Sequence, residues 1–289
     1  MNSFQYTVVI PSVGRPTLAR AIESVLGQSV EASRIIVVGF QLQVESNDEI
    51  QYIETESKVS AGEARRIGTE CVTTEYVAYL DDDDYWMPEK MEIQSKSLSK
   101  SGDLIILNCR AEVLSNFGKM EWPREIKDAN EGICSYLFGE ISLLPGKYYY
   151  PSTGLLMKTK LAKQVGWRNF PHDDWDFYFR AEEMGALFHM IAEKLVVVDQ
   201  SLESTSRTSK VDRCFVFLGR HGQNMTRSQQ RNFLSGVTLQ SALNSKNLSE
   251  IKLVASLVLE KGIFHKSTIV VIIRLLNLRK FFRIFKLVK

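Results

Sequence analysis

Cysteine is scarce in this sequence, and the few cysteines present follow no paired spacing. Cys71, Cys109, Cys134 and Cys214 are widely scattered along the chain. Zinc and redox sites usually carry Cys-x-x-Cys pairs, so both kinds of site are disfavoured. Isolated cysteines are typical of reduced structural thiols in a cytosolic protein.

The N-terminus lacks the basic segment and long apolar run of a signal peptide, and a β-rich segment begins at Tyr6. We therefore expect the folded body to stay in the cytoplasm. Acidic residues are missing from the other end, because residues 261–289 carry eight Lys or Arg and no Asp or Glu. The chain of 289 residues has a net charge of +2, which leaves −6 for residues 1–260. A mildly acidic globular body thus precedes a strongly basic tail.

Apolar runs alternate with segments of helical spacing along most of the chain. Strands are predicted at 6–10, 35–38, 50–53, 76–80, 104–107 and 195–198, and helices at 18–26, 61–71, 88–98 and 175–184. This alternation predicts an α/β fold, with a mainly parallel sheet flanked by helices and a C-terminal helical extension at 216–289. Residues 115–150 are loop-rich and aromatic, and we expect the acceptor side of a site there.

Four consecutive aspartates, Asp81, Asp82, Asp83 and Asp84, follow the apolar run at 76–80. Carboxylates held this close repel one another unless a cation lies between them. Magnesium or manganese is the simplest such partner, because hard cations take carboxylate and phosphate oxygens. Ligands of parallel sheets bind outside the carboxyl ends of the strands, where residues 11–15 should also lie. The alternative is a solvated loop in which Asp84 caps a helix that begins near Pro88.

A second acidic cluster, at residues 172–176, precedes a predicted helix. Asp173 could simply cap that helix. Two acidic clusters about ninety residues apart suggest instead a division of labour, in which one holds a metal and a leaving group and the other supplies a general base.

Three segments together resemble the nucleotide-sugar-binding domain of family 2 inverting glycosyltransferases. They are TVVIPSVGRPTLARAIESVLGQ, AGEARRIGTECVTTEYVAYLDDDDYWMPEKME and HDDWDFYFRAEEMG, in that order. The resemblance covers residues 5 to about 200 and implies the Rossmann-like GT-A fold with a metal-dependent sugar-nucleotide site. It places a glycosyltransferase domain at 1–215, with a nucleotide-sugar half at about 1–110 and an acceptor half at about 111–215.

The resemblance also implies roles for individual residues. In the Asp-x-Asp motif, Asp83 would be the direct metal ligand for Mn²⁺ or Mg²⁺, and Asp81 a further ligand nearer the ribose. Asp174 would be the catalytic base, with Asp173 where the family usually has Glu. The remaining donor-binding residues would be Pro11, Ser12, Arg15, Arg65 and Asp82, and the supporting residues Asp84 and Trp86.

His221 lies in a segment similar to the His-x-x-Asn-x-Ser/Thr stretch that closes over the diphosphate in some members. It is therefore a further candidate metal ligand, and a surface or core histidine is the alternative. The sequence departs from the family after the second strand, where Gly39 and Phe40 replace the usual Asp-Asp-Gly-Ser acids, and Val13 replaces a frequent aromatic. Base recognition must therefore differ in detail, and a UDP-sugar is only the first expectation.

The resemblance implies transfer of a sugar to a hydroxyl of a glycan or a polyprenyl-diphosphate-linked acceptor, in the synthesis of bacterial surface polysaccharide such as O-antigen or capsule. One alternative is a sugar nucleotidyltransferase, which would not require the second acidic cluster. Another is a non-catalytic nucleic-acid-binding protein that uses the basic tail. The acidic body argues against nucleic acid, because its binders usually spread basic charge over the folded surface.

The tail at 263–289 has a basic amphipathic pattern, with cations on one helical face and Leu, Phe and Val on another. Arg274 interrupts the apolar run short of the ~20 residues that a spanning helix needs. We therefore expect peripheral association with the inner face of the cell membrane. A helix packed on the domain, a dimerisation helix and an RNA-binding arm are the alternatives.

Overall fold

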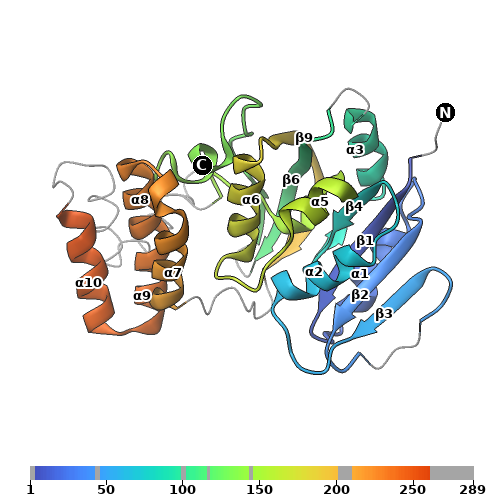
Figure 1. Ribbon diagram of the computed structural model, residues 1–289, viewed down its shortest axis with the longest axis horizontal. Coiled ribbons are helices and arrows are strands. Elements are labelled where there is room, and N and C mark those ends of the chain that lie inside the picture. The colour runs from blue at the N-terminus through green and yellow to red at the C-terminus, as the bar shows by residue number, and fades with distance from the viewer. Residues whose placement is uncertain are drawn as a thin grey trace. The chain divides into compact units, whose positions relative to one another are not determined.

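The structure is a computed structural model that describes residues 4–42, 46–98, 102–115, 118–142, 146–200 and 210–260. The chain divides into two compact units, and we describe each by itself (Figure 1). The first unit comprises residues 1–133 and 146–203, and the second comprises residues 134–145 and 204–289. The basic tail, with its predicted membrane-binding segment, lies outside the described residues.

A nine-stranded sheet forms the first unit, in the order β3-β2-β1-β4-β8-β6-β9-β5 with β7 paired to β6. The strands are β1 (Tyr6–Ser12), β2 (Arg34–Gly39), β3 (Ile50–Glu54), β4 (Tyr76–Tyr79), β5 (Tyr85–Trp86), β6 (Ile105–Ser115), β7 (Gly118–Trp122), β8 (Leu156–Lys158) and β9 (Leu187–Asp199). Strands β1 to β4 pair in parallel, as do β6 and β9. Strands β5, β7 and β8 run antiparallel to their neighbours. The sheet is mixed and mostly parallel, which confirms the predicted α/β class.

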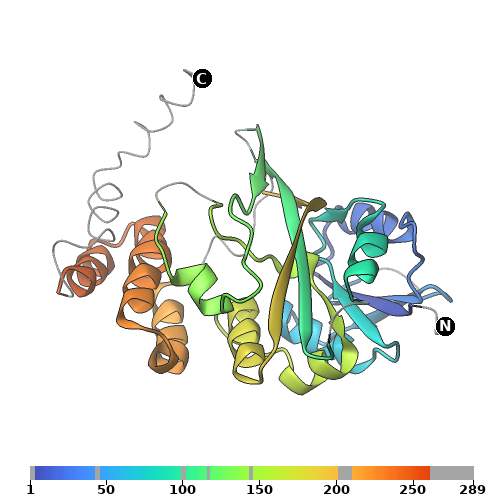
Figure 2. The same cartoon turned by 90° about the horizontal axis from the view of Figure 1, so that it is seen from above.

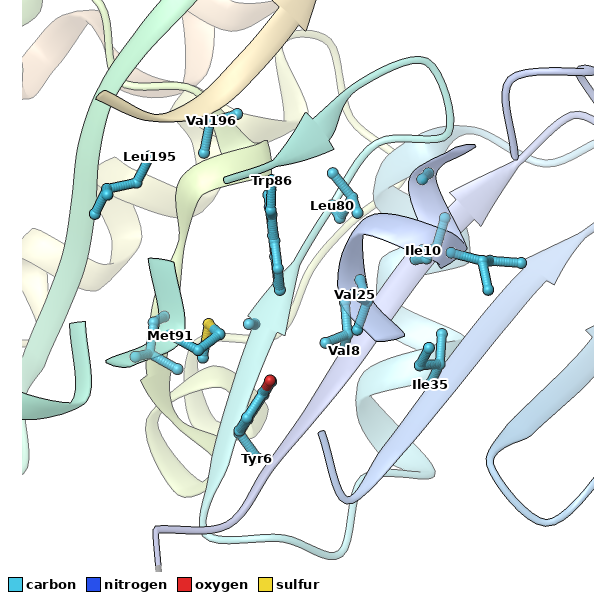
Figure 3. Close-up of a cluster of buried hydrophobic side chains, with 14 of the residues drawn as sticks. Tyr6, Val8, Ile10, Val25, Ile35, Leu80, Trp86, Met91, Leu195 and Val196 are labelled. Carbon is cyan, nitrogen blue, oxygen red and sulfur yellow. The ribbon is translucent and has the colours of Figure 1, made fainter. Parts of the chain in front are cut away.

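Helices cover both faces of this sheet (Figures 1 and 2). They are α1 (Leu18–Leu26), α2 (Ala61–Glu70), α3 (Lys90–Leu98), α5 (Thr159–Val165) and α6 (Asp173–Glu183), with a short 3-10 helix η1 (Ser152–Gly154). Val25 of α1 and Met91 of α3 join Val8 in the buried cluster on one face (Figure 3). On the other face, α2 approaches β1 so closely that a Cβ at Gly68 would lie 2.5 Å from Val9 Cγ1. Val8 and Val9 face different helices because successive strand residues point to opposite faces.

Pro11 lies inside β1, whereas the sequence predicts a strand that ends one residue earlier, at residue 10. Proline removes a backbone donor and is usually excluded from central strands. Here the backbone of Pro11 points to the same side as that of Val9, toward β4, whose pairing with β1 ends at Val9 opposite Tyr79. No ladder hydrogen bond is therefore lost, and β1 continues along β2 to Ser12.

Strands β6 and β9 are much longer than their predicted apolar runs. Along β6, the half-buried Arg110 and Glu112 alternate with the buried Ala111 and Val113. The two strands pair in parallel over most of their lengths, with an irregularity in register around Arg110. Polar residues on one side hide such strands from a search for continuous apolar runs.

The second unit is helical. Its described helices are α7 (Val211–His221), η3 (Gly222–Asn224), α8 (Arg227–Phe233), the π-helical η4 (Leu234–Thr238), α9 (Leu239–Ser245) and α10 (Leu248–Leu259), together with most of α4 (Ile133–Phe138). Val211, Leu239 and Val254 contribute to its own apolar core. The predicted C-terminal helices are thus confirmed as far as residue 260. Within the described ranges, no helix has the length and apolarity needed to cross a membrane.

Candidate active site

The four aspartates form a tight turn between β4 and β5, which we call the acidic turn (residues 81–84). The turn is closed by a backbone hydrogen bond in which Asp84 N donates to Asp81 O at 3.1 Å. It follows the carboxyl end of β4, beside that of β1. The chain after β1 contacts the turn directly, so both predicted loops lie at one edge of the sheet.

Asp82 joins the acidic turn to the loop after β1. Asp82 is 4% exposed, and its carboxylate accepts hydrogen bonds from Ser12 Oγ at 2.8 Å, Val13 N at 3.0 Å and Arg15 Nη1 at 2.9 Å. These contacts occupy Ser12 and Arg15 within the protein. Donor binding by Pro11, Ser12 and Arg15 stays a prediction. The contacts of Ser12 and Arg15 with Asp82 fix the shape of the loop after β1.

Asp83 is held by two arginines that come from different parts of the chain. Arg15 Nη1 lies 2.6 Å from Asp83 Oδ2, and Arg20 Nη2 donates to the Asp83 carbonyl at 2.8 Å. Arg20 also pairs with Asp199 of β9 at 3.1 Å. Burial and the nearby carboxylate of Asp81 raise the pKa of Asp83 to about 6, against the lowering effect of Arg15. The charged form of Asp83 is therefore disfavoured chiefly by burial, and Arg15 offsets this only in part.

Asp84 is buried at the far end of the turn. Its carboxylate accepts a hydrogen bond from Asp199 N at 3.0 Å and another from the hydroxyl of Thr153. Burial, followed by the charges of Asp81 and Asp83, raises the pKa of Asp84 well above its usual range. The carboxylate thus anchors the turn to β9 and η1, whereas α3 begins six residues later, at Lys90.

Arg65 of α2 brings the two predicted acidic clusters together. Its guanidinium donates to Asp81 Oδ1 at 2.5 Å, to Asp173 Oδ2 at 2.9 Å and to Ser152 Oγ at 2.9 Å. Arg65 is 4% exposed and lies over the Trp167 ring, 4.9 Å from its centroid. Burial lowers the pKa of Arg65, but the carboxylates of Asp81 and Asp173 outweigh this and raise it above its ordinary value. Residues 81 and 173, far apart in sequence, thus share one buried cation.

The first residues of α2 allow this helix to pack closely against the start of α6. Ser60 caps the helix by accepting a hydrogen bond from Glu63 N at 3.2 Å. A Cβ at Gly62 would lie 2.3 Å from the Arg168 carbonyl oxygen and 2.8 Å from Asp173 Oδ2. Glycine at this position therefore lets α2 approach the start of α6.

Asp174 lies beside Asp173 in the first turn of α6 and is half-buried. Its Oδ1 accepts a hydrogen bond from Trp175 N at 2.9 Å. Burial and the neighbouring Asp173 raise the pKa of Asp174 to about 7, although Trp175 N and Arg65 favour its charged form. A carboxylate with a pKa near neutrality is much better suited to proton abstraction than an ordinary aspartate.

Several residues around the site had no signal in the sequence. Arg20, Asp199, Ser152 and Thr153 hold the acidic turn. Arg20 lies in the first segment that resembles the family but was not singled out, and the other three belong to no motif or periodic pattern. Tyr149 comes from the loop-rich aromatic region, and its pKa is raised well above the usual value by burial and then by Asp84, Asp81, Asp174 and Asp83. The carboxylates of both acidic clusters therefore act electrostatically on the hydroxyl of Tyr149.

Two other predicted residues have clear places in the structure. The indole of Trp86 donates from Nε1 to the Thr153 carbonyl at 2.8 Å and is buried in the core. His221 belongs to the second unit, where it is 1% exposed and packs against Phe217 with ring centroids 4.8 Å apart. Metal binding by His221 stays a prediction.

The donor atoms of the acidic turn suit a hard divalent cation. No group of three or more His, Cys, Asp or Glu side chains that could hold a metal occurs within the ranges that the structure describes. Mg²⁺ and similar ions commonly take only one or two carboxylates and complete their shell with substrate phosphates and water. Asp81 and Asp83 provide such a partial set. Burial and then the charge of Asp81 raise the pKa of Asp83, and a cation would offset both effects.

Comparisons with known proteins place the chain near glycosyltransferases. Residues 40–166 match the family described as Glycosyl transferase family 2. The chain is 24% identical over 216 residues to the amylovoran biosynthesis glycosyltransferase AmsB of Erwinia amylovora. This match covers 68% of this chain and 69% of AmsB. It is also 24% identical over 138 residues to WfgD of Escherichia coli, a UDP-Glc:alpha-D-GlcNAc-diphosphoundecaprenol beta-1,3-glucosyltransferase. That match covers 44% of this chain and 54% of WfgD.

Solved structures share the fold. S. aureus TarS 1–349 in complex with UDP-GlcNAc superimposes with a TM-score of 0.58 at 14% identity, covering 93% of this chain and 88% of that one. A longer TarS structure gives a TM-score of 0.56 at 11% identity and covers 82% of this chain and 43% of that one. The mixed sheet with its flanking helices is the GT-A architecture of these proteins. The family match over residues 40–166 and the likeness to AmsB identify the chain as a glycosyltransferase that is similar to those of family 2.

Proposed function

We propose that the protein is a metal-dependent transferase that moves a sugar from a UDP-sugar to a hydroxyl of a glycan or polyprenyl-diphosphate-linked acceptor in bacterial surface polysaccharide synthesis. The observation that carries the proposal is the Arg65 bridge between Asp81 and Asp173. It holds a candidate donor-binding turn beside a candidate base, as a single-step displacement requires. The activity named for WfgD, the pathway named for AmsB and the UDP-GlcNAc complex of TarS support the choice of donor and pathway class.

In this reaction the acceptor oxygen attacks the anomeric carbon as the bond from that carbon to the diphosphate oxygen breaks. Asp174 takes the hydroxyl proton, and its raised pKa makes it a competent base near neutral pH. Arg65 keeps Asp173 and Asp81 in place, and Arg15 does the same for Asp83. Asp83 and Asp81 would hold Mn²⁺ or Mg²⁺, which when bound neutralises charge on the leaving diphosphate.

The test is product analysis with purified protein, Mn²⁺, UDP-glucose or UDP-GlcNAc, and a GlcNAc-diphosphate-polyprenol acceptor. Release of UDP with a glycosylated acceptor of inverted anomeric configuration is the expected result. Asp174→Asn should abolish transfer while leaving UDP binding within about threefold, because the base does not contact the nucleotide. Asp48→Asn, at an exposed aspartate, is the matched control. Release of pyrophosphate would favour nucleotidyl transfer and overturn the proposal.

We also propose that residues 263–289 attach the protein to the inner face of the cell membrane. The basic amphipathic sequence supports this, because aromatics can enter the lipid interface while cations face anionic headgroups. Deletion of 263–289 should move the protein from the membrane fraction to the supernatant. Vesicles of phosphatidylglycerol should bind the full chain, and vesicles of phosphatidylcholine should not. Equal partitioning of the full and shortened chains would contradict the attachment.

A further inference from the structure

The 3-10 helix η1 (Ser152–Gly154) lies against the acidic turn but has no role in the reaction described so far. Ser152 and Thr153 are buried, with Thr153 only 1% exposed. Buried hydroxyl groups are costly unless they are hydrogen-bonded. The partners of these two hydroxyls therefore indicate what the helix does.

The hydroxyl of Thr153 connects the two ends of the acidic turn. Thr153 Oγ1 accepts a hydrogen bond from Asp81 N at 3.3 Å, and the same hydroxyl donates to the carboxylate of Asp84. One hydroxyl can do both, because it has a single donor and two acceptor lone pairs. The turn is thus closed twice, once by its own backbone hydrogen bond and once through Thr153.

The hydroxyl of Ser152 orients the first carboxylate of the turn. Ser152 Oγ donates to Asp81 Oδ2 at 3.2 Å and accepts from Arg65 Nη2 at 2.9 Å. Arg65 binds the other oxygen, Asp81 Oδ1. Both oxygens of Asp81 are therefore held, which fixes the rotation of the carboxylate about its Cβ–Cγ bond.

The surrounding residues keep η1 itself in place. Trp86 Nε1 donates to the Thr153 carbonyl at 2.8 Å, and Gln94 Nε2 donates to the Gly154 carbonyl at 3.0 Å. Asn108 Nδ2 donates to the carbonyl of the preceding Pro151 at 2.8 Å. A Cβ at Gly154 would lie 2.1 Å from Asn108 Oδ1, so the packing is tight. The two hydroxyls are presented from a rigid support.

We propose that Ser152 and Thr153 are positioning residues that hold Asp81 and Asp84 so that the acidic turn is ready to receive a metal-diphosphate group. This rests on the proposed function, because it assumes that the turn binds such a group. Preorganisation of this kind lowers the ordering cost at binding. The effect of losing a hydroxyl should therefore appear in metal-dependent nucleotide binding.

The test is calorimetric titration of UDP into the full chain, in the presence of Mn²⁺ and separately in EDTA. Thr153→Val keeps the side-chain shape and removes the hydroxyl, and it should weaken Mn²⁺-dependent UDP binding about tenfold. Thr153→Ser keeps the hydroxyl and should restore binding to within about threefold of the unaltered chain. Ser152→Ala should weaken binding in the same direction and gives a second variant if Thr153→Val folds poorly.

Thr159→Val is the matched control, because Thr159 is a buried threonine in the same unit whose hydroxyl has no hydrogen-bond partner among the described residues. It should leave UDP binding unchanged. Unchanged Mn²⁺-dependent binding in both folded variants, Thr153→Val and Ser152→Ala, would overturn the inference. Equal losses in Thr153→Val and Thr153→Ser would also overturn it, because the hydroxyl would then be irrelevant. If the unaltered chain binds UDP equally with and without Mn²⁺, the metal-dependent proposed function fails instead.

Discussion

Replacement of the candidate base should make the protein more stable, and the gain should depend on pH. The pKa of Asp174 is raised from 3.8 to about 7 by burial and by Asp173. Below about pH 4 the carboxyl group is protonated in both folded and unfolded chains and costs nothing. As the pH rises, the unfolded chain ionises first, so the folded state loses stability until the pH passes about 7. Asp174→Asn removes this penalty.

The size of the effect follows from the shift. One pKa unit corresponds to about 1.4 kcal/mol, so the full shift sets an upper bound of about 4 kcal/mol. Asp174 is only half-buried and interacts with Asp173, and water screens part of the penalty. We therefore expect Asp174→Asn to raise the free energy of unfolding by about 1–2 kcal/mol at pH 8, and by less than half of that at pH 5.

Urea unfolding followed by tryptophan fluorescence at pH 5 and pH 8 measures this difference. Asp48→Asn, at an exposed position, should change the free energy by no more than about 0.5 kcal/mol at either pH. A gain of equal size at both pH values would refute the reasoning, because it could not come from ionisation. A loss of stability at pH 8 would refute it as well and would indicate that the Asp174 carboxylate is well satisfied in the fold.

Three further predictions concern the same site. In transfer assays, kcat/KM should rise with pH and level off above about pH 7, because Asp174 must be deprotonated; a flat profile from pH 5.5 to 8.5 would contradict this. Arg65→Met should lower the free energy of urea unfolding by about 3–5 kcal/mol, since it leaves Asp81 and Asp173 without their shared cation; a loss below 1 kcal/mol would count against the bridge. Asp83→Ala should weaken Mn²⁺-dependent UDP binding at least about tenfold in calorimetry, and an unchanged response to Mn²⁺ would exclude Asp83 as a ligand.

The sequence predicted the elements whose signal is local. Helix α1 was predicted with its observed limits, because its apolar residues repeat at helical spacing and Gly27 ends it. The antiparallel strands β7 and β8 and the two-residue β5 were not predicted. They are short or contain polar residues, and they exist because neighbouring strands pair with them. Pairing of this kind is a tertiary effect that a local pattern does not record.

In the candidate site, too, the residues with a local motif were predicted, and those whose role depends on tertiary contacts were not. The two acidic clusters and Arg65 were predicted from motifs, and the structure places Arg65 between them. Thr153 and Asp199 were missed, because their importance comes from the residues they meet across the fold. The mutual contacts of Ser12, Arg15 and Asp82 were also beyond the sequence, since a motif names residues without giving their partners.

Arg65 pairs with both Asp81 and Asp173, and this restricts which segments can be exchanged between relatives to change substrate specificity. A chimera that joined residues 1–110 of this chain to the later part of a relative would bring in a new segment opposite Arg65. Its active site would be complete only if that segment placed a carboxylate where Asp173 lies and a hydroxyl where Ser152 lies. Otherwise a buried cation would face a vacant position, at a cost of several kcal/mol. Exchange of segments should therefore give new combinations of donor and acceptor chiefly between relatives that keep the ion pairs of Arg65 with both carboxylates.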